Sequence, residues 1–255
     1  MHPVPSSTPE VPVARSTKPK AFDPYAGRDP RDIPAYGTLE AAHYLWVPER
    51  TLQGWVRGYS FKLGEAKRRQ QAVVPVDPET GLLSFADLAE LHVLAALRRE
   101  HGVPLKNIRQ ARDYVQQKWG VPHPLSSEEM ATDGKAVFLR KLGTLMEASR
   151  HGQIVLEEII GARLKRIERD TAGLAALLYP YTSKSVLDKA GAPTLVSIDA
   201  RRAFGRPVVS GTRIPTEEIA GRFFAGDSFD RLVEEYGRRP EEISEAIRYE
   251  WWRAA

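Results

Sequence analysis

The sequence predicts a mostly helical α+β protein with an N-terminal winged helix-turn-helix, a small β-containing middle region and a C-terminal unit of three helices preceded by short strands. Three observations support this prediction. Apolar residues recur at helical spacing over much of the chain, short runs of β-branched residues interrupt them, and glycines and prolines separate the segments. The apolar share of 42% is enough for a buried core.

Composition excludes several classes of protein. The chain has no cysteine, which removes disulfides, thiolate catalysis and cysteine-ligated zinc and suits a reducing cytoplasm. Its apolar runs are far shorter than the roughly 20 residues of a membrane-spanning helix, and the proline-rich start does not fit a signal peptide. We therefore expect a cytoplasmic protein with no membrane partner. The net charge of +4 is only mildly basic, so the position of the charges matters more than their sum.

The chain divides into four segments by composition. Residues 1–33 are rich in proline, with basic and acidic side chains nearly balanced, and such a segment buries too little surface to offset the entropy of ordering it. We predict a disordered tail there. A helical head follows at 34–128, then a β-containing connector at 129–192 that ends in a linker, and a C-terminal domain at 193–255.

Two short helices open the head. Thr38 is a good N-cap for the first helix, and Pro48 fits the first turn of the second. After a polar and basic stretch at 57–70, the apolar runs at 73–76 and 82–83 flank a turn and predict a hairpin. Two short helices followed by a hairpin is the order of a winged helix-turn-helix.

Two longer helices complete the head. Ser84 caps the first of them, and Pro104 begins the second, which runs to about Trp119 with Tyr114 among its inward residues. Acidic side chains offset the basic ones on both helices. We therefore expect them to complete the core and not to form a second basic face.

The middle region is less regular. Residues 137–140 fit a short strand, and residues 155–160 fit either a buried strand or a turn of helix. The segments 163–168 and 174–179, separated by Thr-Ala-Gly, predict a hairpin. The apolar runs at 155–160 and 174–178 are candidate surfaces for a homodimer, and packing in the core is the equal alternative.

The C-terminal unit begins with two short β runs, at 195–198 and 208–209. Three short helices follow, at 216–225, 228–236 and about 240–252.

The segment from Tyr36 to Arg57 resembles the DNA-binding start of MerR-like regulators. The matching residues are Ala41, Ala42, Leu45, Val47, Thr51, Leu52 and Trp55. Two positions depart from that pattern. Trp46 stands where the turn between the helices usually has glycine, and Gly54 lies inside the second helix at a cost of about 1 kcal/mol relative to alanine.

We expect DNA contacts from the second helix and from the basic stretch after it. If this helix enters a major groove, its exposed side chains are those that can bond base edges, namely Glu49, Arg50, Gln53 and Arg57. Residues 50–69 hold six basic side chains and one acidic one, a local charge of +5. Phosphate contacts are therefore predicted for Lys62, Lys67, Arg68 and Arg69. A solvated loop beside a small helical core is the alternative.

The most distinctive stretch runs from Asp199 to Ile219 and contains Gly-Arg-Pro-Val-Val-Ser-Gly-Thr-Arg-Ile-Pro. It is similar to the G-x-P-x-x-x-G-T-R-I-P core of the bacterial family of unknown function numbered 433. The order of head and tail resembles VapB-type antitoxins that carry a winged helix. This resemblance implies a homeodomain-like three-helix unit, a cognate PIN-type ribonuclease toxin as partner, and repression of the protein's own operon through operator DNA. Since bacterial operators are commonly read by symmetric dimers, a homodimer is expected.

Charge favours a protein partner for the C-terminal helices. Residues 214–255 contain ten acidic and six basic side chains, a sum of −4, and such a surface repels phosphates. The candidate toxin contacts are two arginines and four aromatic residues: Arg206, Arg213, Phe223, Phe224, Trp251 and Trp252. For Arg213 the favoured interpretation is a structural role, as a salt-bridge brace of its loop.

We predict no catalytic site, metal site or cofactor. The six histidines are scattered with no ligand-spaced pair, and the chain has neither a phosphate-binding loop nor a dinucleotide fingerprint. His43 and His92 are expected to be packing residues. The alternative functions are a stand-alone MerR-like transcriptional regulator and, more remotely, a metal-dependent nuclease whose carboxylates converge from several elements.

Overall fold

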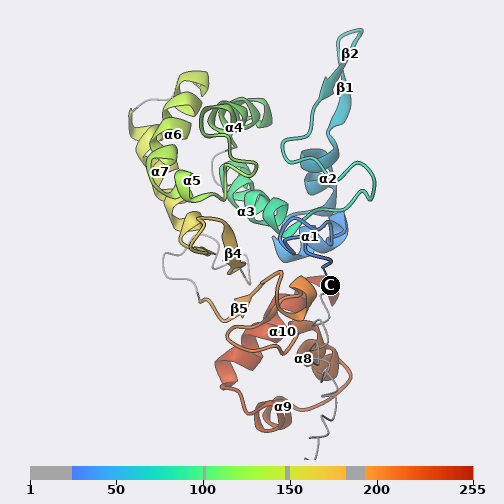
Figure 1. Cartoon of the computed structure of the whole chain (residues 1–255). Coiled ribbons are helices and arrows are strands. Elements are labelled where there is room, and N and C mark those ends of the chain that lie inside the picture. The colour runs from blue at the N-terminus through green and yellow to red at the C-terminus, as the bar shows by residue number, and fades with distance from the viewer. Residues whose placement is uncertain (1–24, 100–101, 147–149, 182–192, 255) are drawn as a thin grey trace, which may run out of the picture.

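The structure is a computed structural model that describes residues 25–99, 102–146, 150–181 and 193–254 (Figure 1). It is mostly helical, with three small antiparallel sheets of two strands each among these residues, so the predicted fold class is confirmed. Helices α1–α7 form the upper body in Figure 1, and helices α8–α10 form a smaller unit below it. None of the described helices is long and apolar enough to cross a membrane. The first 24 residues and most of the expected linker lie outside the described part of the chain.

The described part of the expected tail is ordered. Arg31 is buried and donates hydrogen bonds to Asp29 and to Asp170, which lies 139 positions further along the chain. The Tyr25 hydroxyl donates to the carbonyl of Ala200. The prediction of disorder is therefore wrong for residues 25–33, because their charged side chains find partners in distant segments.

The helix-turn-helix consists of α1 (Thr38–Tyr44) and α2 (Glu49–Arg57). The turn between them is reached by Trp46 in the left-handed region, with φ of 54°, although glycine is the residue that adopts this conformation without strain. The Arg99 guanidinium donates a hydrogen bond of 2.5 Å to the Trp46 carbonyl, which holds the turn in place.

The wing is a hairpin of β1 (Tyr59–Leu63) and β2 (Ala66–Gln70), one segment earlier than predicted. The reason is two glycines with positive φ. Gly58 at the end of α2 turns the chain into β1, and Gly64 lies in the turn between the strands. The predicted hairpin at 73–83 has no regular ladder, and it folds back on α2 through a bond from the Val73 amide to the Trp55 carbonyl.

Two long helices, α3 (Phe85–Arg99) and α4 (Leu105–Trp119), complete the head as predicted. Ser84 caps α3: its hydroxyl accepts from the Asp87 amide, and the Asp87 carboxylate accepts from the Ser84 amide. Tyr114 does not point inward as expected, since its side chain is 41% exposed.

The middle region contains α5 (Glu128–Ala131), α6 (Asp133–Met146), α7 (Arg150–Leu164) and a hairpin of β3 (Ile167–Arg169) with β4 (Ala175–Leu178). The predicted hairpin is present, but its first strand begins later than expected, because residues 163 and 164 are the end of α7. The strand predicted at 137–140 is wrong, because Phe138 and Leu142 are buried one helical turn apart within α6. Residues 155–160 are helical, and Leu156, Ile160 and Leu178 lie in the core.

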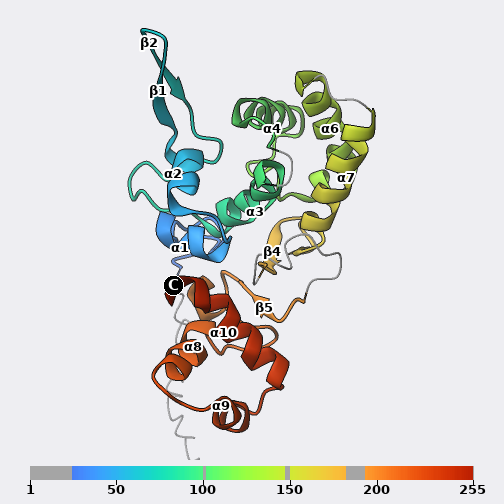
Figure 2. The same cartoon turned by 180° about the vertical axis from the view of Figure 1, so that it is seen from behind.

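The C-terminal unit has the predicted elements: β5 (Val196–Ser197), β6 (Val208–Val209), α8 (Thr216–Phe224), α9 (Phe229–Tyr236) and α10 (Pro240–Ala254). Its three helices enclose a small core of their own that includes Ile219, Leu232 and Ile243. The main core runs from the head through the middle region and ends at Tyr249 of α10. The end of α10 therefore packs against the head, and Figure 2 shows it directly beneath α1.

Candidate nucleic-acid and partner interfaces

Helix α2 has one buried side and one exposed side. Leu52, Trp55 and Val56 fill the wedge against α1, and this leaves the predicted contact residues Arg50, Gln53 and Arg57 in solvent. Two of the exposed side chains are held by local hydrogen bonds. The Gln53 amide donates to Glu49 at 2.9 Å, and the Arg57 guanidinium donates to the Gly81 carbonyl at 3.1 Å. The exposed side of α2 is thus polar and partly ordered.

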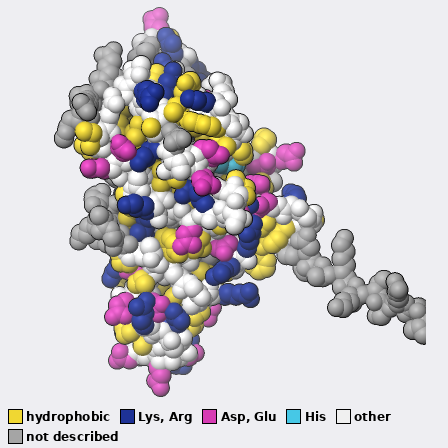
Figure 3. Space-filling view, turned by 60° about the vertical axis from the view of Figure 1, so that its left-hand side comes forward, with side chains coloured by type: hydrophobic (Ala, Val, Ile, Leu, Met, Phe, Trp, Pro, Cys, Tyr) yellow, Lys and Arg dark blue, Asp and Glu magenta, His cyan; other side chains and the backbone are white. Residues whose placement is uncertain are grey.

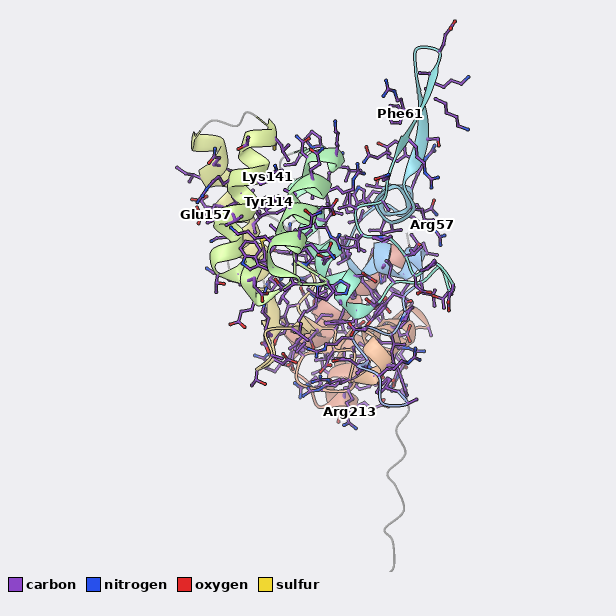
Figure 4. The ribbon with its side chains drawn as sticks, turned by 45° about the horizontal axis from the view of Figure 1, so that its top comes forward. Arg57, Phe61, Tyr114, Lys141, Glu157 and Arg213 are labelled. Atoms are coloured by element: carbon purple, nitrogen blue, oxygen red, sulfur yellow. The ribbon has the colours of Figure 1, made fainter. Side chains whose placement is uncertain are left out.

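The wing continues from α2 and projects beyond the rest of the head (Figures 1 and 4). Lys62 lies directly opposite Lys67 in the antiparallel register, and Ser60 lies opposite Arg69. Like charges directly opposite each other destabilise a hairpin. Within the described ranges, no ion pair neutralises any of the four predicted phosphate contacts, which are all exposed: Lys62, Lys67, Arg68 and Arg69. The wing is therefore a cationic projection whose one carboxylate, Glu65 in the turn, forms no ion pair with these four side chains among the described residues.

The base of the wing is rigid. A side chain at position 58 would collide with the Gln70 carbonyl, so only glycine allows this close approach. The Val73 amide donates to the Trp55 carbonyl at 2.7 Å, and Arg109 of α4 donates to the Gln71 carbonyl at 3.0 Å. The wing and α2 therefore hold a fixed orientation relative to each other.

In the C-terminal unit, unlike the wing, most arginines form ion pairs. Arg222 contacts Asp227 at 2.7 Å and Glu235 at 2.6 Å, and it holds the pKa of both carboxyl groups below the usual value. Arg206, a predicted partner contact, is paired with Glu217 at 2.7 Å. Figure 3 shows basic and acidic side chains interleaved over the lower unit. This unit offers little free positive charge to a phosphate.

Arg213 is the exception in this unit. Its side chain is exposed, it points away from the molecule at the end opposite the wing (Figure 4), and the described part of the chain gives it no ion pair. The favoured interpretation of Arg213 as a salt-bridge brace therefore has no support among the described residues.

An exposed aromatic cluster joins the ends of α8 and α10. The rings of Phe224 and Trp251 are 45% and 55% exposed, and their centroids lie 5.6 Å apart in an edge-to-face arrangement. Phe223 contacts Phe224 but packs partly against the small core. The side chain of Trp252 lies outside the described residues. Three of the four predicted aromatic contacts are thus neighbours on one surface.

Two family models match separate parts of the chain. Residues 34–112 match the family described as "Putative DNA-binding HTH domain" (HTH_66), and residues 196–249 match "Protein of unknown function (DUF433)". The crystal structure of Rv2018 from Mycobacterium tuberculosis is similar, with a TM-score of 0.60 and 26% identity over 85% of this chain and 98% of that one. The curated protein "Putative antitoxin VapB45" of M. tuberculosis is 32% identical over 233 residues, which cover 85% of this chain and 93% of the relative. The chain belongs to the VapB45 family of antitoxins.

In this member of the VapB45 family, the head and the C-terminal unit are joined by buried polar side chains that the sequence patterns do not indicate. His43 of α1 lies 2.9 Å from the Glu250 carboxylate of α10, and the Thr216 hydroxyl donates to the other oxygen of Glu250 at 2.5 Å. The side chains of all three are buried. His43 was expected only to pack, and Glu250 was counted with the surface acids. Glu250 follows Tyr249 on the buried side of α10, and this neighbour was the one sequence feature that could have indicated its burial.

Two tyrosine hydroxyls reinforce the same contact. Tyr249 donates to the Tyr44 carbonyl and Tyr36 donates to the Gly205 carbonyl, each at 3.1 Å. Burial raises the pKa of Tyr36, Tyr44 and Tyr249, so all three stay protonated as donors. A side chain at position 205 would collide with the Tyr36 hydroxyl. These bonds fasten α1 of this VapB45-type antitoxin to the C-terminal unit.

A second buried polar cluster lies behind the helix-turn-helix. The fully buried Glu90 of α3 accepts from Arg112 of α4 at 2.9 Å and from the Leu125 amide at 2.9 Å. His123 Nδ1 is 3.6 Å from Asp87 and 3.7 Å from Glu90, which is within ion-pair distance but too long for a hydrogen bond. Within the described part of the chain, no group of three or more His, Asp or Glu side chains is placed to hold a metal ion.

Proposed function

We propose that this protein is a DNA-binding antitoxin that represses its own operon and neutralises a PIN-type ribonuclease toxin. Membership of the VapB45 family and the helix-turn-helix match support the general role. The observation that carries the DNA-binding part is the wing, whose lysines and arginines have no carboxylate partner among the described residues and whose Lys62 lies directly opposite Lys67. Polyanionic DNA supplies the missing counter-charge. Such a role places the protein in the cytoplasm, with the chromosome.

In the proposed complex, α2 reads the major groove and the wing binds phosphates. Arg50 and Arg57 suit guanine, and Gln53 suits adenine once it leaves Glu49. Lys62, Lys67 and Arg69 neutralise phosphates without reading sequence. A single helix-turn-helix covers a small site, so a homodimer would place two α2 helices in half-sites about one helical turn apart.

The proposed toxin surface is the aromatic cluster of the C-terminal unit together with the exposed Arg213 of the same unit. Phe224 and Trp251 are large exposed rings of the kind that anchor protein interfaces. Arg213 is exposed and unpaired within the described ranges, which makes it available to a carboxylate of a partner. The paired and net acidic charges of the unit argue against phosphate as its ligand.

The DNA part is tested with the full chain and a duplex from the region upstream of its gene. We expect tighter binding than to a scrambled duplex, and a linear fall of log affinity with log salt. Changing Arg50 to alanine should cost about 1–3 kcal/mol and relax sequence preference, whereas Lys67→Ala should weaken both duplexes alike. Equal affinity of the wild type for the two duplexes would refute the operator role.

The toxin part is tested by co-expression with the PIN-type ribonuclease encoded next to the gene. Trp251→Ala and Phe224→Ala should release the toxin and restore its ribonuclease activity while operator binding persists. The matched control is Tyr114→Ala, which removes an exposed ring from another element. If the chain binds its operator but no neighbouring gene product, the alternative of a stand-alone MerR-like regulator is the better description.

A further inference from the structure

The wing has two chemically different faces. Side chains alternate along a strand, and residues directly opposite each other point to the same side. Lys62, Lys67 and Arg69 therefore share one face, which we call the cationic face. Tyr59 and Phe61 lie on the other, the aromatic face, together with Arg68 opposite Phe61.

The aromatic face covers no core. Tyr59 and Phe61 are 49% and 41% exposed, and their ring centroids are 6.0 Å apart. No third strand pairs with the hairpin in the described part of the chain, and the hairpin projects away from the other elements (Figures 1 and 2). Two neighbouring rings on an isolated hairpin contribute little to folding. The exposed position of Tyr59 and Phe61 suits contact with a ligand better than a role in the core.

The position of Tyr59 shows where this face is directed. Its ring lies 3.4 Å from the point where a Cβ of Gly54 would be, so a larger residue at 54 would crowd it. Gly54 lies on the exposed side of α2, one helical turn from both Arg50 and Arg57. The aromatic face therefore continues the surface of α2 that carries the candidate base contacts.

We propose that the aromatic face of the wing contacts DNA bases, with Phe61 as the inserting ring, while the cationic face binds phosphates. This inference rests on the proposed operator binding. The cations on both faces make nucleic acid the matching occupant, since aromatic rings stack on bases and insert between base steps. A minor groove of about 6 Å is narrower than a two-stranded ribbon, so entry of the wing requires the duplex to open or kink there. An apolar wedge stabilises that distortion.

The test compares salt dependence in variants of the full chain on the upstream duplex. Phe61→Ala should lower affinity about 5- to 150-fold at every salt concentration and leave the log-log slope unchanged, because stacking involves no phosphate. Lys67→Ala should reduce the slope by about 0.9. Phe61→Trp should keep most of the affinity. Tyr114→Ala is the matched control, since Tyr114 has the same 41% exposure but lies on α4 beneath Lys141 (Figure 4).

A second readout reports the base directly. A 2-aminopurine placed beside the α2 site should gain fluorescence with the wild type and not with Phe61→Ala. The inference is overturned if Phe61→Ala binds like the wild type while Lys67→Ala is weakened, a result that leaves operator binding intact. It is also overturned if Phe61→Ala changes the oligomeric mass or releases the toxin instead. A wild type that does not prefer the upstream duplex refutes the proposed function itself.

Discussion

Glu250 is a single carboxylate that joins three elements, because it accepts from Thr216 at the start of α8 and contacts His43 of α1. Changing it to alanine removes the buried carboxylate that both the Thr216 hydroxyl and the His43 ring contact. We expect Glu250→Ala to lower the free energy of unfolding by about 2–4 kcal/mol, and Glu250→Gln by less. Denaturant unfolding measures this. Glu241→Ala, at the exposed start of the same helix, is the control and should change little; a Glu250 variant as stable as this control would contradict the prediction.

His123 makes stability depend on pH. Burial opposes its charged form, but the Glu90 and Asp87 carboxylates outweigh burial and raise the pKa of His123 above its usual value. A raised histidine pKa stabilises the fold below the unfolded-state value of about 6.5, and this contribution is lost as the pH rises through the folded-state value.

The raised pKa of His123 predicts how the free energy of unfolding changes with pH. The difference in unfolding free energy between the wild type and His123→Gln should be largest near pH 6 and should shrink towards pH 9. The comparison cancels the opposite effect of His92, whose pKa is lowered by burial and by the nearby Arg163 and Arg166. A difference that stays constant or grows with pH would show that His123 is neutral in the folded protein.

Within the wing, the opposed lysines are expected to lower the stability of the fold and to strengthen the binding of DNA. Lys62→Ala removes one of two opposed charges and should raise the free energy of unfolding by about 0.2–1 kcal/mol. The same variant should bind DNA more weakly, with a salt slope smaller by about 0.9. Denaturant unfolding and DNA titration on one preparation measure both effects. Lys106→Ala, an exposed lysine at the start of α4, should change neither, and a Lys62 variant that matches it would contradict the prediction.

Sequence patterns predicted some of the helices and strands and not others. The helices of the head and of the C-terminal unit were predictable because caps such as Ser84 and buried periodicity agree. The wing was misplaced because 73–83 has the apolar residues of a hairpin, whereas the real strands at 59–70 carry many basic side chains and two exposed rings that cover no core. Residues 137–140 resemble a strand in a short window, and only burial at Leu142 reveals the helix. The exposure of the basic side chains at 62–69 could be predicted without the fold, because a dense run of like charges does not pack into a core.

At the scale of the whole molecule, the head and the C-terminal unit are joined by packing that no local pattern displays. Tyr249 belongs to the main core although it lies near the end of the chain. A chain ending at residue 194 loses that ring and exposes His43 and Tyr44. We expect its melting temperature to fall by at least about 6 °C.

Differential scanning calorimetry checks this expectation. A chain ending at Glu250 keeps the contact and removes only the exposed Trp251 and the residues after it, so it serves as the control and should melt close to the full chain. A truncated head that melts like the full chain would mean that the two parts are energetically independent.

The joint between the two parts also limits how such genes recombine. A head moved onto a different C-terminal unit keeps Tyr36 and His43 but loses the glycine at 205 and the carboxylate at 250 that receive them. Any side chain at position 205 pushes the Tyr36 ring out of place. Shuffling therefore succeeds only when both sides of the joint are inherited together, and engineered chimeras of this family need to graft these four positions as one block.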